Sequence, residues 1–153
     1  MSWKPILSPN DAEELMRLFG DFHDGCIREM HLQTGHWVSP ELSMACTGAL
    51  DTVLRILIQR QFRNPSAIEM LFEQVTRLNL VPSPENYDSI IFEATLIQHN
   101  GEWLWSPEQD WSPSDTERDQ YSWVSARKLS WRDASQWMGR ELRYGPRVEA
   151  DGA

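Results

Sequence analysis

The sequence predicts an α+β fold, in which an antiparallel sheet of about five or six strands forms a meander and an N-terminal helix packs on one face. Two observations favour this fold: a capped amphipathic segment near the N-terminus, and later segments in which apolar and polar residues alternate. The chain has 153 residues, 41% of them hydrophobic, which is enough for one core and too few for two ordinary domains. We therefore expect residues 1–153 to form a single domain.

The N-terminal helix is expected to open at Ser8-Pro9-Asn10-Asp11, which supplies side chains suited to cap the first turn just before Ala12. Glu13 and Glu14 favour the same start, because carboxylates stabilise the positive end of a helix dipole. Leu15, Leu18 and Phe19 then form an apolar stripe for packing on the sheet. Gly20 is expected to end the helix.

A strand is predicted over residues 26–32, followed by a loop over residues 36–43. Residues 50–58 and 68–80 are ambiguous, because their apolar positions fit one face of a strand and one face of a helix almost equally well. We predict two paired strands, since Asp51-Thr52-Val53 is poor helix material and residues 63–66 suit a compact turn. The alternative is an αα-hairpin in the same place.

The clearest local pattern is a β-hairpin. Residues 89–99 alternate, an Asn-Gly pair follows at positions 100 and 101, and residues 102–105 form the returning strand. In this register Leu96 lies opposite Trp105, and Ile97 lies opposite Leu104. A two-residue turn of this kind fixes the pairing of both strands.

The last third of the chain is expected to hold three more features. Residues 106–120 form a long acidic loop, and residues 121–131 form a closing strand. From about residue 139 onward, Gly, Pro and charged residues predict a loose C-terminal tail.

Composition favours a basic protein as the partner and disfavours nucleic acid and membrane. The formal net charge is −9, with 13 acidic against 7 basic residues after residue 80, whereas affinity for nucleic acid depends on Lys and Arg. An acidic surface instead steers the approach of a basic protein. No apolar run approaches the roughly 18 residues that span a bilayer. Two cysteines and the absence of a secretory start predict a cytoplasmic protein with free thiols.

A polar stretch at His23, Asp24 and Cys26 is the one place that suggests a metal- or thiol-dependent enzyme. His23 and Asp24 are adjacent and would point apart in an extended chain, and no completing ligand set is present. We expect these two side chains to hold the turn between helix and sheet, and Cys26 to be a small buried residue. No catalytic residue, metal or cofactor is therefore predicted.

The segment of residues 102–119 is the strongest candidate for a binding surface. It joins three tryptophans to six acidic residues and one basic residue. Aromatic anchors among charged residues are typical of protein interfaces. Trp111 is the expected anchor, because it lies beyond the strand, where a side chain is least needed for core packing. The expected binding residues are Glu108, Asp110, Asp115, Trp111 and Trp103.

Two alternatives stand beside this surface. The tryptophans would also suit a small-ligand or carbohydrate site, although such a site has less need of surplus acid. A tryptophan-rich core with a solvated loop accounts for them as well as a binding role does. The order of helix, Phe22-His23-Asp24-Gly25, alternating strands and closing aromatic strand resembles small uncharacterised bacterial proteins related to immunity proteins of polymorphic-toxin systems. This resemblance implies a non-catalytic inhibitor that binds a basic toxin.

Overall fold

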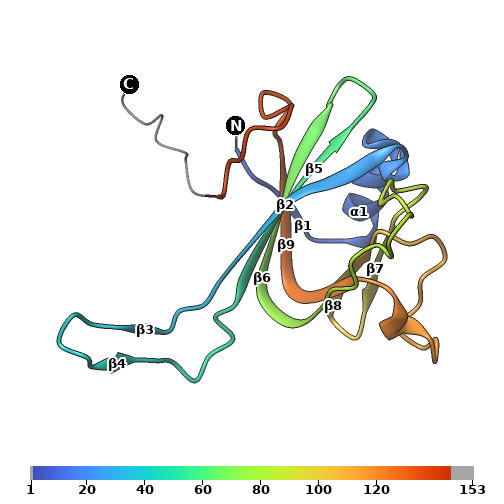
Figure 1. Cartoon of the computed structure of the whole chain (residues 1–153). Coiled ribbons are helices and arrows are strands. Elements are labelled where there is room, and N and C mark those ends of the chain that lie inside the picture. Colours follow the sequence, from blue (N-terminus) through green and yellow to red (C-terminus); the bar gives the residue numbers. More distant parts are fainter. Residues whose placement is uncertain (1, 146–153) are drawn as a thin grey trace, which may run out of the picture.

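The computed structural model describes residues 2–145 and confirms the predicted α+β class. One helix packs against a curled antiparallel sheet of seven strands, and a two-stranded arm projects from one end of the sheet (Figure 1). In the described residues, no helix is both long and apolar enough to cross a membrane.

The elements are as follows. The helix is α1 (Pro9–Leu18), and two short 3-10 turns are η1 (Gly20–Phe22) and η2 (Arg118–Gln120). The main sheet holds β1 (Lys4–Ile6), β2 (Gly25–Gln33), β5 (Val53–Arg60), β6 (Ala67–Asn79), β7 (Thr95–His99), β8 (Glu102–Ser106) and β9 (Trp123–Asp133). The arm holds β3 (Trp37–Val38) and β4 (Met44–Ala45). The order in the main sheet is β2-β5-β6-β9-β8-β7, and β1 also pairs with β9.

The helix begins where its cap predicts. The backbone N–H of Asp11 donates to Ser8 Oγ and the N–H of Ser8 donates to Asp11 Oδ2, both at 3.2 Å, which completes a capping box. The predicted apolar stripe is wrong at one position. Leu18 is exposed, whereas Ala12 joins Leu15 and Phe19 in the core. The buried stripe therefore starts one turn earlier than expected.

The ambiguous central segments are strands, and the αα-hairpin alternative is wrong. β5 and β6 pair antiparallel, with Leu54 opposite Phe72 and Ile56 opposite Met70. All four side chains are buried on the face that carries α1. Their alternation is the period of two that a sheet face requires.

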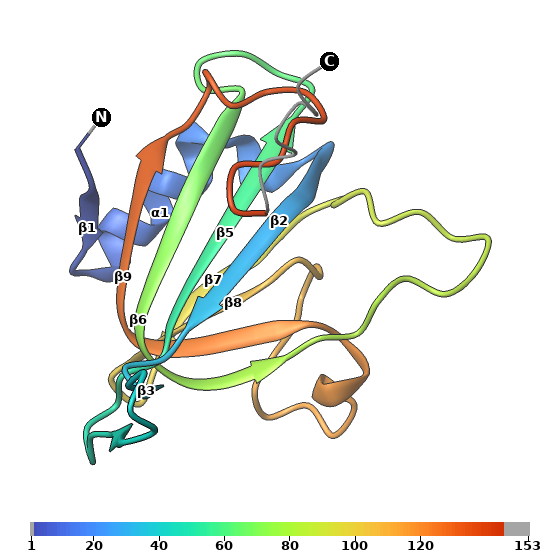
Figure 2. The same cartoon turned by 60° about the vertical axis from the view of Figure 1, so that its left-hand side comes forward.

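The hairpin of β7 and β8 has the predicted register, with Leu96 opposite Trp105 and Ile97 opposite Leu104. Its first strand is shorter than predicted, because β7 begins at Thr95 instead of residue 89. Ile90 and Phe92 are exposed, while Ile91 between them is buried. Residues 80–91 form instead a long loop beside β2, drawn in yellow-green in Figure 2.

The main sheet curls around its own core. β9 pairs with β1 over residues 129–131 and with β8 over residues 124–126, and β6 has a bulge between Val75 and Arg77. β6 and β9 both bend strongly, so that the β7–β8 hairpin comes round toward α1 (Figure 2). The curl ends at a single bridge, where the N–H of Ile91 donates to the Gly25 carbonyl at 2.7 Å.

The loop predicted over residues 36–43 is wrong, and the tail predicted from residue 139 is described only as far as residue 145. Residues 36–43 were expected to form a loop, but Trp37 and Val38 pair with Ala45 and Met44 in the arm. The expected loose tail from residue 139 is held in place as far as residue 145, because the N–H groups of residues 143 and 144 donate to Glu29. The rest of that predicted tail, residues 146–153, lies outside the described residues.

Candidate functional site

The two tryptophans predicted as binding anchors are buried. Trp111 is 5% exposed and Trp103 is 4% exposed, so neither ring is available to a partner. The expectation that core packing leaves Trp111 free is therefore wrong. Burying a large aromatic ring is more favourable in free energy than leaving it in water, and here Leu104 of β8 and Trp123 of β9 supply the apolar neighbours.

The Trp111 ring belongs to a small apolar cluster behind the acidic loop. It packs on Trp123 with the ring centroids 5.0 Å apart, and Leu104 completes the buried part of the cluster. The indole N–H donates to the Arg118 carbonyl at 3.1 Å, which satisfies its polar atom. Trp111 thus anchors the loop of residues 107–122 to the sheet.

The acidic side chains of the same loop remain at the surface. Glu108, Asp110 and Asp115 are exposed. Among the described residues none of them forms an ion pair, whereas Asp119 is paired with Arg77 at 3.0 Å. The predicted acidic surface is therefore present without its predicted aromatic anchors.

An apolar hollow of about 530 Å³ lies beside β2 and meets this acidic surface at Glu108. We call it the β2 groove. Ile27 and Met30 of β2 form one wall, and the loop of residues 80–91 forms the other. The floor and rim are completed by residues 107–108 and 120–122. The exposed apolar side chains of the loop wall are Leu80, Val81, Tyr87 and Ile90.

The β3–β4 arm, residues 34–52, is a second exposed apolar surface. Trp37 is 62% exposed, and Val38, Leu42 and Met44 are also exposed. The arm carries no Lys or Arg. Apolar side chains gathered on a projecting element are typical of interaction surfaces. The one sequence signal for this arm is the presence of Trp37, Val38, Leu42 and Met44 in a stretch with the composition of a loop.

His23 and Asp24 lie at the turn between η1 and β2, as predicted. A ring nitrogen of His23, Nδ1, is 2.8 Å from the Phe92 carbonyl oxygen, and its other nitrogen is 3.4 Å from Asp24 Oδ2. The N–H of Asp24 donates to the Ile91 carbonyl at 2.9 Å. These contacts tie the turn to the end of the curled sheet.

Cys26 is exposed, so the expectation of a buried cysteine is wrong. It is the second residue of β2, opposite Gln59 on the neighbouring strand. Within residues 2–145, no group of three or more His, Cys, Asp and Glu side chains is placed to hold a metal ion.

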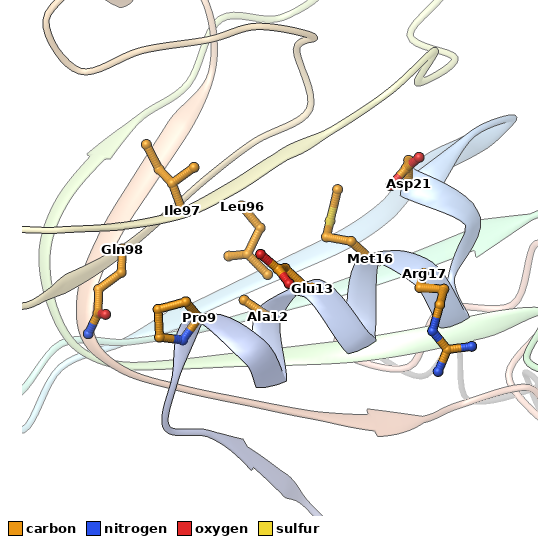
Figure 3. A pocket seen from close by; sticks show the side chains of 9 residues that line it. All are labelled: Pro9, Ala12, Glu13, Met16, Arg17, Asp21, Leu96, Ile97 and Gln98. Carbon is orange, nitrogen blue, oxygen red and sulfur yellow. The ribbon is translucent and has the colours of Figure 1, made fainter.

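A hollow of about 660 Å³ lies between α1 and β7 (Figure 3). Its floor is formed by Ala12, Met16 and Leu96. The carboxylate of Glu13 points toward β7, whereas the guanidinium of Arg17 points away from it. Among residues 2–145, no tryptophan lines this hollow.

The tryptophan count itself is largely explained by the core. The buried rings are Trp103, Trp105, Trp111, Trp123 and Trp131. Trp3 and Trp137 are partly buried and both stack on the Arg132 guanidinium, at 4.4 and 5.0 Å. Of the eight rings, Trp37 on the arm is the one with a largely exposed face.

A buried acidic cluster, which the sequence analysis missed, lies on the convex face of the sheet. Glu69 of β6 is 0% exposed. Its carboxylate forms an ion pair with Arg132 at 2.7 Å and accepts a hydrogen bond from the Tyr144 hydroxyl at 2.5 Å. Glu29 of β2 accepts backbone N–H groups from Arg143 at 2.8 Å and Tyr144 at 3.0 Å. The cluster thus fastens the C-terminal segment across β2, β5 and β6.

The Tyr144 hydroxyl gives this cluster a measurable pH dependence. Burial, followed by the Glu69 hydrogen bond, raises the pKa of Tyr144 well above its ordinary value of 10.0. The unfolded chain therefore ionises this phenol first. Its stabilising contribution is complete below about pH 10 and is lost as the pH rises further.

We expect the free energy of unfolding of the Tyr144→Phe variant to fall less steeply above about pH 10 than that of the unmodified protein. Urea denaturation at pH 8 and at pH 10.5–11 measures the difference. Tyr87→Phe is the control, because Tyr87 is exposed. Parallel pH profiles for the unmodified protein and the Tyr144→Phe variant would contradict the role of this hydroxyl.

Comparison with models of known protein families, with curated protein sequences and with solved structures finds no match.

Proposed function

We propose that this chain is a non-catalytic, acidic module that binds a basic protein, and that it acts as an immunity-type inhibitor of a basic toxin. The observation that carries the binding role is the surface around Glu108. There, exposed carboxylates without ion pairs border an apolar groove. Apolar area supplies affinity, and surrounding charge of one sign selects a partner of the other sign.

The net charge supports the same class of partner. With a formal charge of −9, the chain repels other acidic proteins and attracts basic ones at distances of about 10 Å or less. The inhibitor role is supported by the resemblance in layout around residues 22–25 and by this charge. Protein binding by an inhibitor needs no catalytic group, and the His23 and Asp24 contacts are of a structural kind.

A photo-crosslinking amino acid at position 109, between Glu108 and Asp110, tests the proposal in cells of the source organism. Gln109 is exposed, so the replacement leaves the core intact. We expect a crosslinked protein in which Lys and Arg outnumber Asp and Glu. The same group at position 14, on the outer face of α1, is the control. Equal crosslinking from both positions, or an acidic crosslinked protein, would contradict the proposal.

The inhibitor role has a separate test. We expect a neighbouring gene to encode a small basic toxin domain, and co-expression of this chain to restore growth of cells that produce that domain. Growth that stays arrested, or neighbouring genes without such a domain, would contradict this part of the proposal while leaving the binding role standing.

Charge reversal at the acidic loop is expected to slow association with the crosslinked protein. An Asp110→Lys, Asp115→Lys double variant should lower the association rate constant by about tenfold and weaken its salt dependence, because exposed rim charges act mainly on encounter. Stopped-flow or surface plasmon resonance measurements at two salt concentrations give the rate constant. The control is a Glu13→Lys, Glu14→Lys double variant on α1, which changes the net charge by the same amount. An equal effect of both double variants would show that net charge alone matters.

A further inference from the structure

We propose that the β2 groove receives an extended segment of the basic partner, which adds to the free edge of β2 as a further strand. This inference rests on the proposed function and specifies how the partner is bound. It follows from three properties of the groove: an unpaired strand edge, an apolar lining and a rim of carboxylates.

The first property is the unpaired edge of β2. β2 ends the main sheet and pairs with β5 on one side only. On its other side, the bridge between Gly25 and Ile91 is the last pairing among the described residues. From residue 28 to residue 33, the edge therefore keeps alternate N–H and carbonyl groups that have no strand partner within residues 2–145. Such an edge is a template for an incoming extended chain.

The lining of the groove suits the side chains of that added strand. Ile27 and Met30 pack against the core from β2, and across the groove Tyr87 and Ile90 expose 76% and 59% of their surface. Successive side chains of a strand point to opposite faces, so every second residue of the added strand would face this lining. The lining therefore selects apolar residues at alternate positions.

The rim of the groove selects the charge of the added segment. Asp88 and Glu108 line the groove, and neither forms an ion pair among residues 2–145. In the part of the chain that the structure describes, no Lys, Arg or His lines the groove. A basic segment with apolar residues at alternate positions thus matches the lining in period and the rim in charge, whereas a second copy of this acidic chain would add repulsion.

The test uses two synthetic peptides, acetyl-(Lys-Val)4-amide and acetyl-(Glu-Val)4-amide. They have the same apolar residues and opposite charge. We expect the Lys peptide to bind at least about tenfold more tightly in isothermal titration calorimetry and to slow hydrogen exchange of amides in residues 28–33. Equal binding of both peptides, or binding that leaves these amides unprotected, would overturn the inference.

Variants of the groove locate the binding. Tyr87→Ala with Ile90→Ser removes two exposed side chains and should abolish peptide binding without loss of stability. Leu42→Ala with Met44→Ala on the arm is the matched control and should bind normally. Asp88→Asn with Glu108→Gln should weaken binding of the Lys peptide by about 2- to 30-fold, as two exposed ion pairs would.

Two further outcomes separate this inference from the proposed function. Analytical ultracentrifugation shows whether the chain forms dimers. Dimers in which hydrogen exchange of residues 28–33 is slowed would overturn the inference, because a second copy would then occupy the edge. A crosslinked basic protein that binds the Tyr87→Ala, Ile90→Ser variant normally would also overturn it, while the proposed function would survive on the acidic loop alone.

Discussion

Replacing Trp111 with alanine is expected to lower the free energy of unfolding by about 3–5 kcal/mol, as loss of a large buried aromatic side chain does. The ring packs on Trp123 and Leu104, and its N–H donates to the Arg118 carbonyl at 3.1 Å. Truncation leaves a cavity under the acidic loop and removes the bond that holds η2 in place. Equilibrium denaturation in urea, followed by circular dichroism, measures the loss.

The control for this experiment is Trp37→Ala, which removes the same side chain from the exposed arm. Its effect on the free energy of unfolding is expected to stay within about 0.5 kcal/mol. A Trp111→Ala variant that is as stable as Trp37→Ala would contradict the packing described here. It would restore Trp111 as a free anchor for a partner.

Replacing Arg132 with alanine is expected to cost about 3–5 kcal/mol, because it leaves the Glu69 carboxylate buried without its cation. Both Arg132 Nε and Nη2 lie 2.7 Å from Glu69 Oε1. The same guanidinium stacks on Trp3 and Trp137, so apolar contacts are lost as well. Urea denaturation at pH 7 measures this change.

Arg127→Ala is the matched control, since Arg127 is an exposed residue of the same strand. We expect its free energy of unfolding to change by less than about 0.5 kcal/mol. An Arg132→Ala variant that loses no more stability than Arg127→Ala would show that Glu69 does not depend on this ion pair.

The sequence was most informative where a single local signal decided the geometry. The Asn-Gly pair at positions 100 and 101 fixed the β7–β8 register, and Ser8 with Asp11 fixed the start of α1. Alternation in residues 50–58 and 68–80 fitted a helix nearly as well as a strand, and the poor helix propensity of Asp51-Thr52-Val53 with the turn at residues 63–66 identified the paired strands. In these cases the determining contacts are close in sequence.

The predictions failed where contacts between residues outside a short sequence window determine the structure. β1 has three residues and owes its pairing to residues 129–131, more than a hundred positions away. Trp111 is buried because Trp123 folds back on it across the loop. The carboxylate of Glu29 is fixed by residues 143 and 144 at the other end of the chain. No pattern within a short window contains this information.

Of the residues proposed for binding, Glu108, Asp110 and Asp115 are exposed and the tryptophans are buried. The apolar part of the proposed site comes from β2 and residues 80–91, which the sequence did not single out. One signal was available: Glu69 lies in an otherwise apolar run from Ala67 to Phe72, where a charged residue needs a partner. That signal predicts a buried ion pair, not a binding site.

Hydrogen exchange of the chain, free and in complex with the basic protein crosslinked from position 109, tests the central claim most directly. The account predicts slower exchange in the complex at residues 28–33, 80–91 and 107–115, and unchanged exchange over the outer face of α1. Protection confined to α1 and β7, or to the arm alone, would place the partner elsewhere and contradict the account.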